Sequence, residues 1–436
     1  MRLRGQTVTE LIQAIRGMND VLPAQSQAWQ NLERRFIRCL TQYGYEEIRF
    51  PLVESTQLFK RSIGDLTDII EKEMYTFNDL NGDSLTLRPE GTAGCVRACL
   101  EHGLLYNQQQ KLWYMGPMYR HEKPQKGRYR QFTQFGIEAF GIPGVAVELE
   151  LILICQRLWR DLGIENAVEL QINTLGELGE RQHYKEKLVA YLQKHSDSLD
   201  EDCLRRLERN PLRILDSKNP KVQEMLQQAP KLSDSLGEAS QQAFDALCVG
   251  LRQLNINYVI NPHLVRGLDY YGHAVFEWIS DKLGAQATVC GGGRYDALVA
   301  LLGGNATPAV GVAMGAERLL LLLEILNQNR LEILPVTFFM IASNDEALHL
   351  GLALSEKLRD SLPDCRVMTN ARSGSFKSQF KKADKSGADF ALIIGEDELK
   401  NKTIGLKNLR KLEEQISLSE EDLFIYLQQY LYTHSN

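Results

Sequence analysis

The hydrophobic positions near the start of the chain follow first a helical and then a strand pattern. Between residues 29 and 43 the large apolar side chains recur at helical spacing, at Trp29, Leu32, Phe36, Cys39, Leu40 and Tyr43. This spacing predicts an amphipathic helix, and Gly44 is well placed to end it. The following segment, YEEIRFPLVE, alternates as a strand does until Pro51, so a strand is expected there.

A long hairpin is predicted next. Residues 112–119 and 131–140 alternate as strands, and Pro124 and Gly127 mark the segment between them as a loop. The stretch YRHEKPQKGRYRQFTQF, residues 119–135, holds six basic side chains and one carboxylate. The hairpin loop is therefore expected to be cationic, although the chain as a whole carries a net charge of −6.

The middle of the chain changes character. Residues 171–258 predict polar helices rich in Glu, Lys and Gln, which we interpret as an inserted helical unit interrupted by Pro211, Pro220 and Pro230. Strand-forming sequence returns at residues 273–279, and residues 310–326 predict a strand that leads into a buried helix. A new unit begins near Pro335, where VTFFMIA, CRVMTN and FALIIG alternate with helical segments as in a small α/β domain.

Composition agrees with a soluble globular protein. A length of 436 residues predicts about three domains, and 44% hydrophobic and 24% charged residues are ordinary proportions. Apolar runs such as Leu319 to Leu323 are far shorter than a membrane span, and the N-terminus lacks the apolar stretch of a secretory signal. The eight cysteines form no CxxC pair, which disfavours a zinc site or a disulfide framework and suits a reducing cytosol.

Three arginines stand in contexts that suggest a polyphosphate ligand. Arg120 ends a predicted strand, Arg266 lies in LVRGLDYY, and Arg318 begins a leucine-rich helix. Buried arginines need an anionic partner, and guanidinium groups match phosphate geometry. A structural pair with a carboxylate such as the adjacent Glu317 is the local alternative. No P-loop occurs, and the contiguous glycines of VCGGGRYDALV break the dinucleotide-loop spacing, so a tight turn leading into a helix is the local expectation there.

Several segments together resemble class II aminoacyl-tRNA synthetases. GYEEIRFPLV (44–53) is similar to motif 1, the Tyr119–Glu122 segment with Arg128 and Phe132 is similar to motif 2, and GVAMGAERLLLLL (311–323) is similar to motif 3. LVRGLDYY (264–271) and GGRYD (292–296) resemble the two signature peptides of the histidyl-tRNA synthetase family, of the bacterial type. RPEGTAG and NPLRILDSKNP resemble the same family, and the likeness extends over nearly the full chain.

The resemblance implies a domain organisation and an activity. It implies an α+β catalytic domain on a mostly antiparallel sheet (1–170 and 259–326), a helical insertion (171–258) and a C-terminal α/β anticodon-binding domain (335–436). The implied reaction is ATP-dependent ligation of L-histidine to tRNA(His) through histidyl-adenylate, with Mg²⁺ on the β- and γ-phosphates of ATP. The implied protein is a cytoplasmic homodimer that uses no membrane and no protein-bound metal.

The resemblance also implies roles for individual residues. Arg266 and Arg120 would be catalytic, because they would stabilise charge at the α-phosphate. ATP would be bound by Arg120, Glu122, Arg128, Phe132 and Arg318. Histidine would be bound by Glu90, Thr92, Gln134, Glu138, Arg266, Tyr270 and Tyr271. The tRNA would be contacted by Lys123, Gln125 and Lys126 in the hairpin loop and by Arg372, Lys377 and Lys381 in the C-terminal domain.

Local alternatives remain beside these roles. Glu138 in a predicted strand suits a solvated face, Tyr271 suits core packing, and the basic run between Arg366 and Lys385 suits a solvated helix face. A regulatory paralogue acting with ATP phosphoribosyltransferase is the rival function. Such paralogues typically lack the anticodon-binding domain and parts of the motifs, which this chain retains. An adenylating enzyme with an acceptor other than tRNA is a third possibility.

Overall fold

The computed structural model of the chain describes residues 11–64, 67, 69–217, 219–284, 287–327, 335–370 and 375–434. These residues divide between two compact units, residues 1–331 and residues 332–436.

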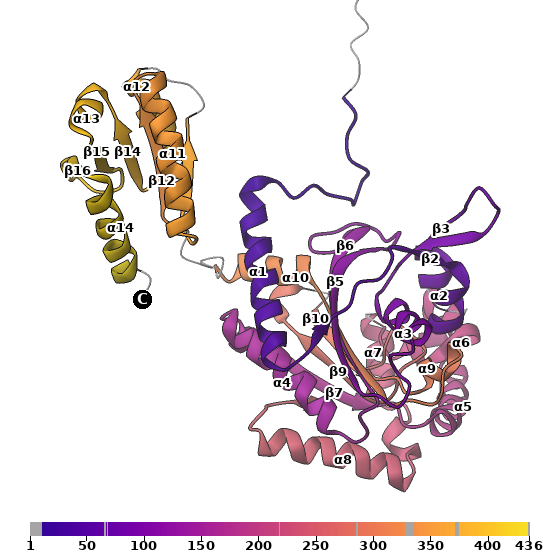
Figure 1. Cartoon of the computed structure of the whole chain (residues 1–436). Helices are drawn as coiled ribbons and strands as arrows, with labels where there is room; N and C mark the ends of the chain where they lie inside the picture. The colour runs from indigo at the N-terminus through magenta and orange to yellow at the C-terminus, as the bar shows by residue number, and fades with distance from the viewer. Residues whose placement is uncertain are drawn as a thin grey trace, which may run out of the picture. The chain divides into compact units, whose positions relative to one another are not determined.

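The first unit is built on an eight-stranded sheet (Figure 1). In spatial order its strands are β1 (Glu46–Glu47), β5 (Gln110–Tyr119), β6 (Gln131–Phe140), β11 (Ala309–Gly315), β10 (Thr288–Arg294), β9 (Gly272–Ile279), β7 (Glu169–Thr174) and β8 (Val259–Ile260). Only the outermost pairs, β1 with β5 and β7 with β8, run parallel. The sheet is therefore mostly antiparallel, as expected, and the predicted long hairpin is β5 and β6 paired from Gln110 to Phe140.

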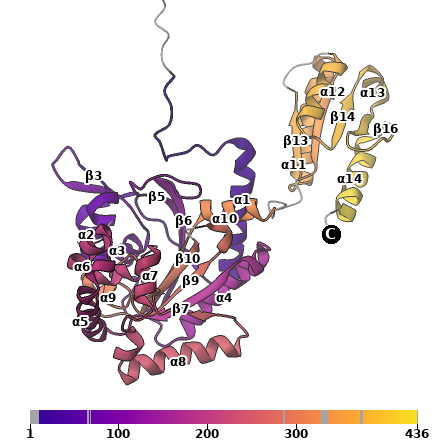
Figure 2. The ribbon, with the colours of Figure 1, turned by 180° about the vertical axis from the view of Figure 1, so that it is seen from behind.

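Helices cover both faces of this sheet, as Figures 1 and 2 show from opposite sides. One face shares a core with α1 (Pro23–Gln42), α4 (Ala146–Asp161), α8 (Glu238–Gln253) and α10 (Ala316–Ile325). The other face packs against α3 (Thr92–Glu101), α9 (Ala297–Leu301) and the inserted helices α5 (Leu178–Lys194), α6 (Glu201–Arg209) and α7 (Pro220–Leu226). A three-stranded sheet of β2 (Val53–Ser55), β4 (Ser84–Leu87) and β3 (Tyr75–Asn78) lies beside α2 (Thr56–Ile63).

The structure corrects three of the sequence expectations. The boundary of the insertion at residue 171 falls inside β7, because ELQINT pairs with β9 from Glu169 to Thr174. The expected insertion also includes α8 near its other end, but Leu247 and Leu251 of α8 are buried in the core shared with α4. The contiguous glycines 291–293 lie in β10 instead of a turn, and the expected strand after Gly44 is two short strands on either side of Pro51.

The second unit is a five-stranded sheet with helices on both faces. Its order is β13 (Arg366–Thr369), β12 (Thr337–Ala342), β14 (Phe390–Ile394), β15 (Ile404–Asn408) and β16 (Ile416–Leu418). The first three strands are parallel. The two inner ones, β12 and β14, are almost entirely apolar and fully buried because helices cover both of their faces. Those helices are α11 (Asp345–Ser361), α12 (Phe376–Lys385), α13 (Glu396–Asn401) and α14 (Glu420–His434). This is the α/β unit that the sequence predicts.

Candidate active site

A cavity of about 810 Å³ opens on the eight-stranded sheet. Most of the residues that sequence analysis assigns to ATP and histidine line it: Glu90, Thr92, Arg120, Glu122, Arg128, Phe132, Gln134, Arg266, Tyr270, Tyr271 and Arg318. They come from segments more than 200 residues apart in the chain, which the sheet brings together. Glu138 is the exception, since it is buried and contacts the cavity lining through Thr92.

The hairpin supplies one wall of the cavity. At the end of β5, Arg120 Nε donates to the carbonyl of Pro89 at 2.8 Å, and its guanidinium lies 5.3 Å from the ring centre of Phe132 on β6. Glu122 and Arg128 form an ion pair across the loop. The turn between them requires Gly127, whose φ of +73° is unfavourable for other residues. The wall thus presents an aromatic face beside two guanidinium groups.

The start of α10 supplies the opposite wall. Arg318 Nε donates to the carbonyl of Thr288 at 2.7 Å, while Glu317 Oε1 accepts from the backbone N–H of Thr133 at 2.8 Å. The two neighbours therefore contact different strands. Burial raises the pKa of Glu317 to about 7. Its Oε2 is buried and has no hydrogen-bond partner among the described residues.

Arg266 lies in the floor of the cavity. Its guanidinium pairs with Glu277 of β9 and lies 5.3 Å from the ring centre of Tyr271. Glu277 also accepts from the Thr288 hydroxyl at 2.9 Å. A Cβ at position 291 would overlap this guanidinium, which explains why β10 has a glycine there. Arg266 thus has both properties considered from the sequence: a structural carboxylate partner and a place in the cavity.

The N-terminus of α3 forms the part of the site assigned to histidine. Glu90 accepts from the backbone N–H groups of Thr92 at 2.7 Å and Ala93 at 2.9 Å. Burial raises the pKa of Glu90, although these hydrogen bonds oppose the shift. Gln134 Oε1 accepts from the N–H of Gly91 at 2.9 Å. Two buried polar groups are therefore fixed at the cavity surface.

Glu138 lies directly behind Thr92. Thr92 Oγ1 donates to its Oε1 at 2.7 Å, Tyr114 donates to the same atom at 3.2 Å, and Tyr295 donates to Oε2 at 2.5 Å. Glu138 is only 1% exposed, so the alternative of a solvated face is wrong. Sequence analysis missed Tyr114 and Tyr295 as members of this network. Tyr295 lies within the GGRYD peptide, so a sequence motif pointed to it, whereas Tyr114 lies in none of the motifs.

The residues assigned to tRNA lie on surfaces. Lys123, Gln125 and Lys126 are exposed in the hairpin loop, and the Lys126 amine lies 3.8 Å from the carboxylate of Glu324. In the second unit, Lys377 and Lys381 are exposed on α12. Their exposure fits both the RNA-binding role and the solvated-face alternative. Arg372 lies outside the described residues.

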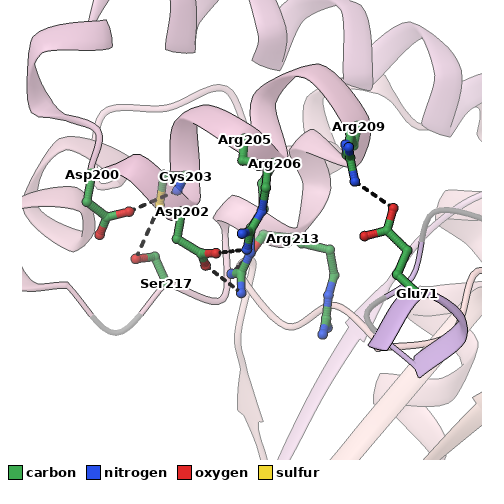
Figure 3. Close-up of polar contacts among 9 residues, drawn as sticks. All are labelled: Glu71, Asp200, Asp202, Cys203, Arg205, Arg206, Arg209, Arg213 and Ser217. Atoms are coloured by element: carbon green, nitrogen blue, oxygen red, sulfur yellow. Dashed lines mark hydrogen bonds and ion pairs between the residues drawn. The ribbon is translucent and has the colours of Figure 1, made fainter. Parts of the chain in front are cut away.

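A basic cluster that sequence analysis did not single out lies on the inserted helices (Figure 3). On α6, Arg205 and Arg206 both pair with Asp202. Arg209 pairs with Glu71 at 2.7 Å, and Glu71 belongs to a short π-helix (Ile69–Glu73). This last pair joins the inserted helices to the N-terminal part of the catalytic unit. Such partly exposed pairs contribute at most about 1 kcal/mol each.

Two features are absent from the described residues. None of their helices has the length and apolar character needed to cross a membrane. They also contain no cluster of three or more His, Cys, Asp or Glu side chains arranged to hold a metal ion.

Family models match both units of the chain. One described as histidyl-tRNA synthetase matches residues 17–319, and one described as an anticodon binding domain matches residues 335–430. The chain is 61% identical to the histidine–tRNA ligase of Legionella pneumophila (strain Lens) over 424 residues, which is 97% of this chain and 100% of that protein.

Solved structures share the fold of this chain. The apo histidyl-tRNA synthetase of S. aureus matches with a TM-score of 0.78 at 36% identity, over 95% of this chain and 99% of that chain. A protein of Bacillus halodurans described as an ATP phosphoribosyltransferase regulatory subunit/histidyl-tRNA synthetase has a TM-score of 0.63 at 20% identity, over 89% of this chain and 99% of that one. At that identity the likeness shows the fold alone.

Proposed function

Because the chain belongs to the histidyl-tRNA synthetase family, we propose that its 810 Å³ cavity binds ATP and histidine side by side. The chain ligates L-histidine to tRNA(His) with ATP through histidyl-adenylate, releasing AMP and diphosphate. The observation that carries the proposed site is the convergence of three arginines, Arg120, Arg266 and Arg318, on one cavity that also exposes Glu90 and Gln134.

The hairpin wall and the start of α10 form the ATP subsite. Adenine stacks on Phe132, and Arg120 contacts the α-phosphate, since guanidinium groups pair well with phosphate oxygens. Arg128 holds the distal phosphates, Glu122 contributes there through its ion pair with Arg128, and Arg318 binds the nucleotide from the opposite wall. This assignment is supported by the cavity position of all five side chains.

The α3 side of the cavity is the histidine subsite. Glu90, Thr92 and Gln134 receive the α-ammonium group, because two carboxylate or amide oxygens and a hydroxyl lie at the cavity surface there. Tyr271 and Glu138 pair with the two imidazole nitrogens, which offer one donor and one acceptor in the neutral ring. Tyr270 closes this end of the cavity.

Catalysis in this site is positioning and electrostatic stabilisation. The histidine carboxylate attacks the α-phosphorus of ATP, and the bond to diphosphate breaks. Arg266 and Arg120 stabilise the negative charge that develops on the α-phosphate oxygens. A ribose hydroxyl of the terminal adenosine of tRNA then attacks the histidyl carbonyl carbon, and AMP leaves.

Residues at the nucleotide end of the cavity would hold the Mg²⁺ that accompanies ATP. The cavity wall contains two carboxylates, Glu122 and Glu317, at the nucleotide end, and oxygen ligands are those that Mg²⁺ prefers. The buried Oε2 of Glu317, which has no partner among the described residues, fits such a ligand. Mg²⁺ would supply neutralisation of the charge on the leaving diphosphate.

The remaining assignments concern assembly and tRNA. We assign the catalytic role to the first unit outside its inserted helices, and anticodon binding to residues 335–436. Lys123, Gln125 and Lys126 contact the acceptor end of the tRNA, and Arg372, Lys377 and Lys381 contact its anticodon arm. The protein acts as a homodimer through the motif 1 region, in the cytoplasm.

Two assays test this function. ATP–diphosphate exchange in the absence of tRNA should depend on histidine, and purified tRNA(His) should accept histidine. A regulatory paralogue would show neither activity, and an adenylating enzyme with another acceptor would show exchange without charging of tRNA.

A further inference from the structure

Tyr295 connects the buried carboxylate of Glu138 to both tyrosines of the first signature peptide. It follows β10 and is 1% exposed. Its hydroxyl donates to Glu138 Oε2 at 2.5 Å. Its ring lies 5.6 Å from that of Tyr270 and 6.2 Å from that of Tyr271, both in edge-on geometry. Tyr295 does not itself line the cavity.

The carboxylate of Glu138 has little freedom in this environment. Thr92 and Tyr114 donate to its Oε1, so Tyr295 is the donor that fixes Oε2. On the other side, Glu138 lies opposite Gly311 of β11, where a Cβ would overlap the carboxylate. The glycine and the three hydroxyls together define one orientation of this side chain.

Burial and neighbouring groups set the protonation of Glu138. Burial raises its pKa to about 8, and the hydrogen bonds from Tyr295, Thr92 and Tyr114 act in the opposite direction. Among the described residues no basic side chain forms an ion pair with it. The titratable groups that face it from the surrounding elements are Glu90, Cys95, Tyr114, Tyr270, Tyr271, Tyr295 and, more remotely, Tyr45.

We propose that Tyr295 is a positioning residue for histidine selection, which holds the Glu138 carboxylate in the orientation that pairs with the imidazole ring. This inference rests on the proposed assignment of Glu138 to the imidazole. Its consequence is that deletion of one hydroxyl, outside the cavity, weakens histidine binding and leaves ATP binding unchanged.

Tyr295→Phe isolates this hydroxyl, because phenylalanine retains the ring contacts. At a pH above about 8, where Glu138 is ionised, loss of a hydrogen bond to this charged group corresponds to about a 10- to 100-fold change in histidine binding. In ATP–diphosphate exchange we expect the KM for histidine to rise by that factor. The KM for ATP and the kcat at saturating histidine should stay within about threefold of the unchanged protein.

The matched control is Tyr45→Phe. Tyr45 is 4% exposed and donates to the carboxylate of Glu150 at 2.9 Å, away from the cavity. Burial raises its pKa, so the group is neutral in the measured range and its removal changes no charge. This variant should leave the KM for histidine unchanged.

The pH profile distinguishes positioning from packing. The Tyr295 hydrogen bond favours the ionised carboxylate, so its loss raises the pKa of Glu138 further. The ionised carboxylate is the form that binds histidine in this proposal, so the acidic limb of kcat/KM for histidine should move to higher pH in Tyr295→Phe. The limb should not move in Tyr45→Phe. An unshifted limb in Tyr295→Phe contradicts the proposal.

A double-mutant cycle with Glu138→Gln, read by calorimetric titration of histidine into each folded variant, completes the test. If Tyr295 acts through Glu138, the effect of Tyr295→Phe should shrink at least threefold in the Glu138→Gln background. Equal effects in both backgrounds, or an unchanged affinity in Tyr295→Phe, overturn the positioning role. Normal affinity in Glu138→Gln itself would instead remove the assignment of Glu138, and with it this inference.

Discussion

Replacement of Arg266 by glutamine should separate catalysis from stability at the floor of the cavity. The Arg266 and Glu277 side chains are 16% and 15% exposed, so their ion pair is largely shielded from water. Removal of the guanidinium takes away a donor to the charge that develops on the α-phosphate. Loss of one such preorganised donor typically costs about 2.7–4 kcal/mol, which is roughly a 10²- to 10³-fold fall in adenylate formation.

The same change leaves the Glu277 carboxylate without its cation. Breaking a buried pair in this way costs about 3–5 kcal/mol of stability, and the remaining hydrogen bond from Thr288 places the expected cost at the lower end. The double variant Arg266→Gln with Glu277→Gln removes the uncompensated charge. It should therefore recover much of the lost thermal stability, but none of the lost exchange activity.

Arg294→Gln is the matched control. Arg294 pairs with buried Glu148 at 2.7 Å, with side chains 9% and 1% exposed, but it does not line the cavity. Its variant should lose stability to a similar degree, while the folded fraction retains exchange activity. Exchange within threefold of the unchanged protein in folded Arg266→Gln would refute the assignment of Arg266 to the reacting phosphate.

Three further predictions follow from the site and the domain organisation. Glu138→Ala and Tyr271→Phe should each lower kcat/KM for histidine by about 10²–10⁴, because an imidazole nitrogen of the substrate loses its hydrogen bond. The KM for ATP should stay within threefold, and unchanged histidine kinetics would place the imidazole elsewhere. A protein that ends near residue 330 should still form histidyl-adenylate if light scattering shows a dimer, but its KM for tRNA should rise by orders of magnitude; charging equal to that of the full chain would contradict the anticodon-binding role. Burial holds the pKa of Glu317 near 7 instead of its usual 4.5, so this group lowers stability as pH rises through that range. The Tm of Glu317→Gln relative to the unchanged protein should therefore increase from pH 4.5 to about pH 7 and then level off, whereas a constant difference would argue against the raised pKa.

The sequence predicts the hairpin of the catalytic sheet well, because its signals are local. Alternation defines β5 and β6, and Pro124 with Gly127 defines the loop between them. The insertion boundary is wrong for the opposite reason. The strand ELQINT is assigned by its partner β9, which lies about 100 residues later in the chain. No pattern near residue 171 reports that pairing.

The candidate site also contains residues that local motifs predict and residues that only distant contacts explain. The motif residues converge on one cavity, as their resemblance implies. Only the three-dimensional structure explains why positions 91, 136 and 311 are glycine. A Cβ at Gly91 or Gly136 would overlap the Tyr114 ring, and one at Gly311 would overlap the carboxylate of Glu138. Tyr114 was missed because a buried tyrosine in a strand is also ordinary core, and its hydrogen bonds to Glu138 and Gln134 are what distinguish it.

The central claim is that this chain activates histidine and transfers it to tRNA. The most direct test is ATP–diphosphate exchange with each of the twenty amino acids in turn, without tRNA. Histidine alone should support exchange, with all other amino acids at least about 10³-fold less effective, because the site hydrogen-bonds both imidazole nitrogens. Exchange with another amino acid at a comparable rate, or no exchange with histidine, would contradict the account.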